Sequence, residues 1–271
     1  MMKLSDLTRA LRAAGIDDAA GEARLLFSYV TGTAPALLVG CDPASDNPAL
    51  ADVLMRRTRR EPLCYITGEV GFCHETYRVT PDCLIPRADT ELIVETAARR
   101  LHRGAHFADL CTGSGCIAVS TLAARTDCTA DAYDIAEKTL ALSAENAARN
   151  GVAERIHFHR RDLLTEEIDG VYDAILSNPP YIRDDVLPTL APELAFEPRI
   201  ALAGGRDGMD FYRAILTLGA GHLAPGGFFL FEIGYDQKQA ILDLAAAHGY
   251  RAEVTDDLGG NPRCACLQTT D

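Results

Sequence analysis

The feature that most constrains the fold is a regular alternation of short apolar runs with amphipathic stretches beyond about residue 90. The apolar runs predict strands at 106–110, 156–159, 172–177 and 228–233, and a further strand that ends at Asp134. The stretches between these runs predict helices. Parallel strands joined by right-handed helical crossovers produce this alternation. We therefore predict an α/β fold with a doubly wound, mainly parallel sheet.

Two further runs, 251–255 and 264–268, predict a closing hairpin that completes a seven-stranded sheet with an antiparallel strand at one edge. The chain before this α/β region has a different pattern. Residues 1–64 predict short helices, because apolar residues recur at helical spacing between Gly, Asp and Pro signals. Residues 65–85 predict a β-hairpin linker. We expect residues 1–64 to form a helical domain and 86–271 to form the α/β domain.

Four arginines, Arg56, Arg57, Arg59 and Arg60, lie at the end of a predicted helix. They are interpreted either as a solvated helix C-terminus, where cations are favoured, or as a patch that contacts RNA or a ribonucleoprotein.

Composition excludes several classes of protein. The net charge of −13 argues against affinity based mainly on nucleic-acid phosphates. No apolar run is long enough to span a membrane, and the start of the chain lacks a secretory h-region. The nine cysteines are scattered, without the spacing of a zinc site, so no metal is expected. These observations predict a cytoplasmic protein with no membrane association and no stable nucleic-acid binding.

In doubly wound sheets the ligand lies at the carboxyl ends of the strands, beside the point where strand order reverses. The first strand ends in a glycine-rich turn, which permits close approach of the backbone to a ligand. On its own this turn also fits a dinucleotide fingerprint or a structural turn. Its candidate cofactor-binding residues are Asp109, Cys111, Thr112, Gly113, Ser114 and Gly115.

Acidic residues follow the next two strands. Asp134 can accept both hydroxyls of a ribose, or it can act as a helix N-cap. Asp162 and Leu163 follow the third strand and can meet an adenine through one carboxylate and one backbone N–H. The alternative for Asp162 is an ordinary polar turn.

The sequence Asn178-Pro179-Pro180-Tyr181 follows the fourth strand. Each proline has a fixed φ and restricts the residue before it to extended conformations. The side-chain oxygen of Asn178 and the carbonyl of Pro179 can therefore act together as two acceptors. Their matching partner is a planar NH₂ group, which has two donors in one plane, and Tyr181 supplies a flat face.

With these motifs, the chain resembles the class I S-adenosylmethionine-dependent methyltransferases, a Rossmann-like family, that modify planar nitrogens. The stretch 84–91, LIPRADTE, resembles the signature of the HemK-type protein-(glutamine-N5) methyltransferases. The resemblance implies methyl transfer from S-adenosylmethionine to the glutamine side chain of the GGQ motif in class I peptide chain release factors. The product of the cofactor would be S-adenosylhomocysteine.

The resemblance also implies residue roles. The turn 111–115 would lie against the methionine and ribose portions of the cofactor, Asp134 would hold the ribose, and Asp162 with Leu163 would hold the adenine. Asn178, Pro179, Pro180 and Tyr181 would form the catalytic amide pocket, and Asn178 would touch the cofactor as well as the substrate glutamine. Cys111 stands where the family commonly has glycine. Because Cys111 has a Cβ, we expect its φ to be negative.

Three other functions compete with this interpretation. A nucleic-acid N-methyltransferase would use the same Asn-Pro-Pro-Tyr chemistry on a flipped base. An NAD-dependent dehydrogenase would explain the glycine turn but not the prolines. A non-catalytic adaptor would show no turnover.

Overall fold

The computed structural model describes residues 1–269, which form two compact units. The first unit comprises Met1–Glu69 together with Ala191–Phe196. The second comprises Val70–Leu190 and the chain from Glu197 onward. Each unit has a buried apolar core of its own. The segment Ala191–Phe196 therefore belongs to a unit that is otherwise built by the N-terminal part of the chain.

The first unit is helical, as its apolar spacing predicts. Asp18 caps its second helix by accepting a hydrogen bond from the backbone N–H of Gly21 at 2.9 Å, and Gly32 ends that helix in the left-handed region. Leu7, Leu11 and Leu26 are fully buried between the helices. The elements are β1 (Met2–Lys3), α1 (Leu4–Ala13), α2 (Ala19–Thr31), η1 (Pro35–Leu38), β2 (Ala44–Ser45), α3 (Ala49–Thr58), α4 (Leu63–Thr67) and η5 (Pro192–Phe196).

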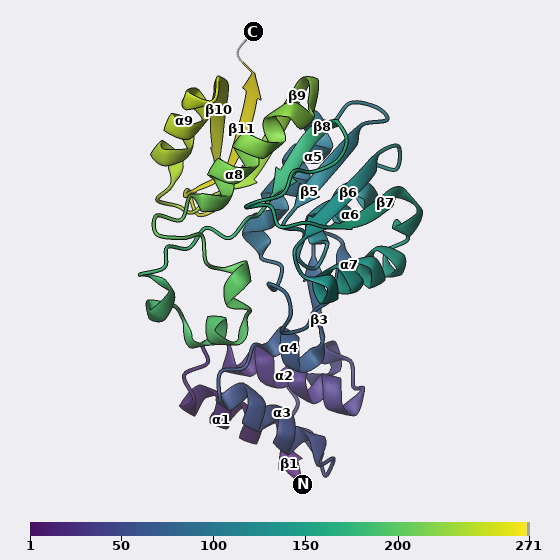
Figure 1. Cartoon of the computed structure of the whole chain (residues 1–271). Coiled ribbons are helices and arrows are strands. Elements are labelled where there is room, and N and C mark those ends of the chain that lie inside the picture. The colour runs from purple at the N-terminus through teal and green to yellow at the C-terminus, as the bar shows by residue number, and fades with distance from the viewer. Residues whose placement is uncertain (270–271) are drawn as a thin grey trace. The chain divides into compact units, whose positions relative to one another are not determined.

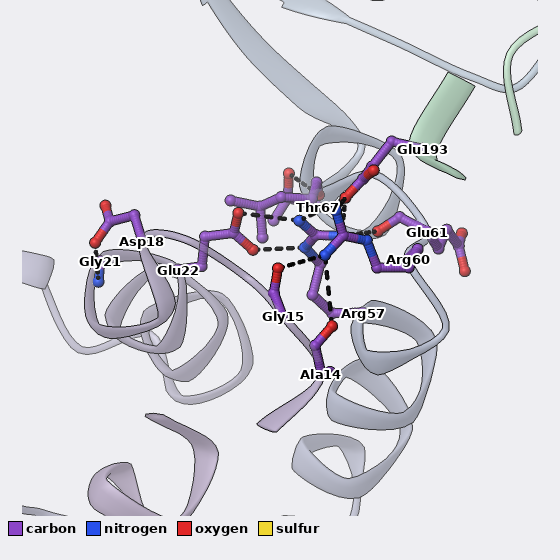
Figure 2. A network of polar contacts seen from close by, with 11 residues as sticks. Ala14, Gly15, Asp18, Gly21, Glu22, Arg57, Arg60, Glu61, Thr67 and Glu193 are labelled. Atoms are coloured by element: carbon purple, nitrogen blue, oxygen red, sulfur yellow. Dashed lines mark hydrogen bonds and ion pairs between the residues drawn. The ribbon is translucent and has the colours of Figure 1, made fainter. Parts of the chain in front are cut away.

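Arg57, in the arginine cluster at the end of α3, fits neither interpretation made from the sequence. The Arg57 side chain is only 6% exposed and forms a fork with the carboxylate of Glu22, at 2.5 and 3.2 Å (Figure 2). Arg57 and Arg60 also pair with Glu193, at 3.3 and 2.8 Å. Arg56 pairs with Glu61 at 2.5 Å. Three of the four guanidinium groups are therefore held in ion pairs within the first unit, and only that of Arg57 is withdrawn from solvent, while Arg56 and Arg60 are half-buried.

The predicted hairpin between residues 65 and 85 is shorter in the structure. Its strands are β3 (Glu69–Phe72) and β4 (Glu75–Arg78), and Cys73 adopts a positive φ of 52° in the turn. Tyr65 and Ile66 belong to the helix α4 instead. Pro62 explains the difference, because a proline just before a helix fixes its φ and needs no N–H donor there.

The second unit is built on a seven-stranded sheet of order β10-β11-β9-β8-β5-β6-β7. Neighbouring strands from β9 to β7 are parallel. The strands are β5 (His106–Leu110), β6 (Thr129–Asp134), β7 (Ile156–Arg160), β8 (Tyr172–Ser177), β9 (Leu223–Glu232), β10 (Tyr250–Asp256) and β11 (Pro262–Thr269). The class of fold predicted from the sequence is thus confirmed.

The position predicted for the antiparallel strand is wrong. The strand β11 runs antiparallel to both its neighbours and lies second from the edge, while β10 forms the edge. The side chains of Cys264–Leu267 in β11 are all buried, whereas β10 alternates between buried or half-buried and exposed positions. A strand that is buried on both faces belongs inside a sheet, which explains the order.

Helices cover both faces of this sheet (Figure 1). One core joins α5, α6 and α7 to the sheet through side chains such as Val94, Leu122 and Phe107. The other joins α8 and α9 to the opposite face, through Leu216, Ile241 and Phe229. The helices and turns are η2 (Ala88–Thr90), α5 (Glu91–Arg100), α6 (Cys116–Ala124), α7 (Glu137–Arg149), η3 (Ala153–Arg155), η4 (Leu187–Thr189), η6 (Arg199–Ala201), α8 (Asp210–Gly219), η7 (Ala220–His222) and α9 (Lys238–Ala247).

Within residues 1–269, none of the helices combines the length and the apolar character needed to cross a membrane.

Candidate active site

A cavity opens in the second unit at the carboxyl ends of the parallel strands. The strand order reverses between β5 and β8, whose last residues, Leu110 and Ser177, pair directly. The loops that follow β5, β6, β7 and β8 all contribute to the cavity wall. The lining residues are Asp82, Cys83, Leu84, Pro86, Thr90, Cys111, Thr112, Gly113, Ser114, Cys116, Ile117, Asp134, Ile135, Ala136, Thr139, Arg161, Asp162, Leu163, Leu164, Asn178, Pro180, Ile200, Ala201 and Phe211.

The turn after β5 carries three positive φ angles, at Cys111 (58°), Gly113 (58°) and Gly115 (82°). The expectation of a negative φ at Cys111 is therefore wrong. The turn is fixed from outside, because the hydroxyl of Ser177 donates to the Leu110 carbonyl at 2.6 Å and the hydroxyl of Ser143 donates to the Gly113 carbonyl at 2.5 Å. These bonds hold the backbone in a conformation that a cysteine adopts only at a cost of roughly 1–2 kcal/mol.

Asp109 lies beneath this turn and does not line the cavity. Its carboxylate accepts hydrogen bonds from the Thr112 hydroxyl at 2.6 Å and from the Ala118 backbone N–H at 3.2 Å. Complete burial raises the pKa of Asp109 to about 7, against the effect of these hydrogen bonds. The structure thus places Asp109 where it holds the turn onto the start of α6.

Asp134 ends β6 and faces the same turn. Its carboxylate accepts hydrogen bonds from the backbone N–H of Gly113 at 3.1 Å and of Ala136 at 3.0 Å. Burial raises the pKa of Asp134, although these backbone bonds oppose the shift. Because Ala136 is the N-cap of α7, the simple N-cap alternative for Asp134 does not describe the structure. The carboxylate lines the cavity, and each of its two oxygens is held by one backbone N–H while keeping the capacity to accept a further hydrogen bond.

The loop after β7 brings Asp162 and Leu163 to the cavity beside apolar neighbours, including Ile135 and Leu164. The Asp162 carboxylate accepts a hydrogen bond from the Leu164 backbone N–H at 3.0 Å, and its own backbone N–H donates to Glu166 at 2.6 Å. This wall combines an apolar surface with a polar edge, which is what a flat heteroaromatic ring requires.

Asn178 lines the cavity at the end of β8, and its side chain leads to a buried polar chain. The Asn178 Nδ2 lies 3.3 Å from the hydroxyl oxygen of Thr90, which donates to Glu232 Oε2 at 2.6 Å. The other oxygen of Glu232 accepts from the Tyr181 hydroxyl at 3.3 Å. Glu232 is 2% exposed. One buried carboxylate thus joins the motif 178–181 to the stretch 84–91.

A second carboxylate fixes the stretch 84–91. Glu197 accepts a hydrogen bond from the Ile85 backbone N–H at 3.1 Å and forms a short ion pair with Arg87. The side chain of Glu197 is 1% exposed. Glu197 therefore anchors this stretch against the chain that returns from the segment 191–196.

Most of the predicted site residues meet at the one cavity. Asp109, Gly115, Pro179 and Tyr181 do not line it, although Gly115 belongs to the turn and Tyr181 reaches Glu232. Sequence analysis missed Thr90 and Glu232. A signal for Glu232 exists, since it is the one acidic residue that ends the apolar run 228–233 at the ligand-facing edge.

Comparisons with known proteins match this architecture. Residues 88–196 match the family described as Methyltransferase small domain, and residues 4–68 match the PrmC N-terminal domain. A methyltransferase structure from Pyrococcus furiosus shares the fold, with a TM-score of 0.54 and 18% identity over 72% of this chain and 89% of that one.

Two relatives are similar over nearly their whole length. A release factor glutamine methyltransferase from Cereibacter sphaeroides is 42% identical over 97% of each chain. One from Moorella thermoacetica is 40% identical over 96% of this chain and 95% of its own. Together with the seven-stranded fold and the cavity at its switch point, these similarities show that the chain belongs to the release factor glutamine methyltransferase family.

Proposed function

We propose that this protein transfers a methyl group from S-adenosylmethionine to the side-chain amide nitrogen of the GGQ glutamine in class I peptide chain release factors. The observation that carries the proposal is the convergence of the four predicted loops, through Gly113, Asp134, Leu163 and Asn178, on one cavity. The full-length similarity to named release factor glutamine methyltransferases supports the substrate.

The chemistry of the cavity fits the cofactor. Asp134 offers acceptor atoms for two ribose hydroxyls, and the wall of Ile135, Leu163 and Leu164 suits an adenine. The turn 111–114 would accommodate the methionine portion. When bound, S-adenosylmethionine supplies an electrophilic methyl group on a sulfonium centre.

The protein's contribution to the reaction is to hold a poor nucleophile. An amide nitrogen is weakly nucleophilic because its lone pair is delocalised. The Asn178 side-chain oxygen and the Pro179 carbonyl would each accept one hydrogen of the substrate NH₂ group. Their negative dipoles stabilise positive charge that develops on that nitrogen as it gains the methyl group, and the nitrogen then releases one proton to solvent. Orientation of this kind contributes roughly 7–11 kcal/mol in the best cases.

We further propose that residues 1–64 help to bind the release factor, because one glutamine offers too little contact for specificity. We assign the reaction to the cytoplasm, since nine cysteines without a disulfide among residues 1–269 suit a reducing compartment.

The test is a methylation assay with a purified class I release factor, the same factor with its GGQ glutamine replaced, DNA and RNA. We expect transfer only to the unaltered factor. Transfer to nucleic acid, or equal transfer to the factor that lacks the glutamine, would contradict the proposal.

A further inference from the structure

The hydroxyl of Thr90 belongs to a buried polar chain. Thr90 is the last residue of the turn η2, directly before α5, and its φ of −67° and ψ of −20° are helical, so it does not have the extended conformation of a capping residue. Its side chain makes no capping bond. It points to Glu232, at 2.6 Å, and to the Asn178 amide, at 3.3 Å. The Thr90 hydroxyl therefore links Glu232 to Asn178.

The chain of hydrogen bonds has a direction. An ionised carboxylate only accepts, so the single hydrogen of the Thr90 hydroxyl goes to Glu232. The oxygen of Thr90 is then an acceptor toward Asn178. Only the NH₂ end of the Asn178 amide can fill that acceptor, and the carbonyl end faces the other way.

The two oxygens of Glu232 each accept a hydrogen bond, one from Thr90 and the other from Tyr181. Burial raises the pKa of Glu232, and the neighbouring Asp89 acts in the same sense. The hydrogen bonds from Thr90 and Tyr181 and the nearby Arg263 guanidinium oppose this shift and favour the ionised form, which only accepts. The guanidinium of Arg263 is itself held by Asp257 at 3.2 Å and by Asp89 at 3.3 Å.

We propose that Thr90 and Glu232 are positioning residues that hold the Asn178 amide with its oxygen toward the substrate. The inference rests on the proposed function, because the hydrogens to be accepted are those of a glutamine amide. A flipped Asn178 would present its own NH₂ group to the substrate NH₂ group, so that two donors would face each other. Neither Thr90 nor Glu232 needs to touch the substrate for this effect.

The first test is kinetic. Thr90→Val removes the hydroxyl with little change in shape, and we expect kcat to fall on the order of 10- to 100-fold, somewhat less than for loss of a complete polar contact. The KM for the release factor and the Kd for S-adenosylhomocysteine should change by less than about threefold. Thr90→Ser should restore most of the rate, while Glu232→Gln, which can donate as well as accept, should lower kcat as Thr90→Val does.

The matched control is Thr121→Val. Thr121 is also a fully buried threonine of the second unit, and its hydroxyl has no hydrogen-bond partner within residues 1–269. We expect this variant to keep the wild-type kcat. A double-mutant cycle separates positioning from general damage, because Thr90→Val should have no further effect on kcat in an Asn178→Ala background. Additive losses, or a wild-type kcat in Thr90→Val, would overturn the proposal.

A second measurement does not depend on turnover. In ¹⁵N-labelled protein bound to S-adenosylhomocysteine, one Nδ2 hydrogen of Asn178 should exchange slowly, and Thr90→Val but not Thr90→Ser should remove this protection. If the wild-type protein fails to methylate the release factor, the proposed function fails while this signal still tests the positioning. Equal exchange in wild type and Thr90→Val would refute the inference.

Discussion

Replacing Arg57 with Met should selectively loosen the first unit. The Arg57 guanidinium is 6% exposed and binds two carboxylates, Glu22 and Glu193, that are themselves 20% and 23% exposed (Figure 2). Removing one partner of a buried ion pair typically costs about 3–5 kcal/mol, because the other charge stays buried. Solvent reaches part of both carboxylates, and Arg60 still pairs with Glu193 at 2.8 Å, so we expect roughly 2–4 kcal/mol here.

Amide hydrogen exchange followed by mass spectrometry can measure this loss locally. A change of 2–4 kcal/mol corresponds to exchange that is roughly 30- to 1,000-fold faster in the protected amides of α2 and α3. Amides of β5 and β8 in the second unit provide an internal reference. Arg59→Met is the matched control, because Arg59 is exposed and makes no side-chain ion pair within residues 1–269.

The pH dependence gives a further check. The pKa of Glu193 lies below its ordinary value of 4.5. Burial opposes this shift, but the carboxylate accepts hydrogen bonds from the Glu193 backbone N–H, from Arg60 and from Arg57, and these outweigh burial. Because the pKa of Glu193 is lower in the folded protein than in the unfolded chain, its ion pairs with Arg57 and Arg60 stabilise the protein fully at a pH above the unfolded pKa. This stabilisation is lost as the pH falls through the folded pKa. The difference between Arg57→Met and wild type should therefore shrink in acid. Unchanged exchange in α2 and α3 at neutral pH would refute this account of the network.

Four other perturbations test the second unit. Asp134→Ala should weaken binding of S-adenosylhomocysteine by about 10- to 100-fold, as calorimetric titration would measure, because a charge-assisted contact contributes roughly 1.5–3 kcal/mol; unchanged affinity in a folded variant would remove Asp134 from the cofactor site. Thr121→Val should raise the free energy of unfolding by about 1 kcal/mol, since it removes a buried hydroxyl without a partner; a loss in urea denaturation would contradict that. Because burial raises the pKa of Asp109 to about 7, its contribution to the free energy of unfolding should decline as pH rises from about 4 to 7; Asp109→Asn should flatten that slope, and an identical slope would argue against the shift. Burial also raises the pKa of the Cys111 thiol well above 9.0, so iodoacetamide should alkylate Cys111 more slowly than the exposed Cys41 at pH 8; faster labelling of Cys111 in peptide mapping would refute this.

The sequence predicted the sheet and the position of the cavity because both follow from local signals. The apolar runs 106–110 and 172–177 are short and bounded by turn residues, so the residue at which each strand ends and its loop begins is clear from the sequence. The sequence did not predict that β11 lies between β9 and β10, since that order depends on which of the two similar strands is more deeply buried.

The residues that escaped prediction act over long distances in the chain. Thr90 and Glu232 are separated by 142 positions, and their contact forms because α5 packs against β9. The sequence allowed Arg57 to be interpreted as a solvated charge, because its partner Glu193 lies 136 positions away in the chain. The positive φ of Cys111 was missed because residue type gives only a preference, which the hydrogen bonds around the turn override.

The return of residues 191–196 to the first unit has a consequence for how such a protein can change its specificity. A binding domain at the end of a chain can be exchanged by one recombination event, because one junction joins it to the rest. Here the polypeptide crosses between the units three times, after Glu69, after Leu190 and after Phe196. A transplanted N-terminal region would lose Glu193 and meet a foreign segment in its place. We therefore expect the two units to be inherited together, with new substrate preferences arising through point substitutions rather than through domain exchange.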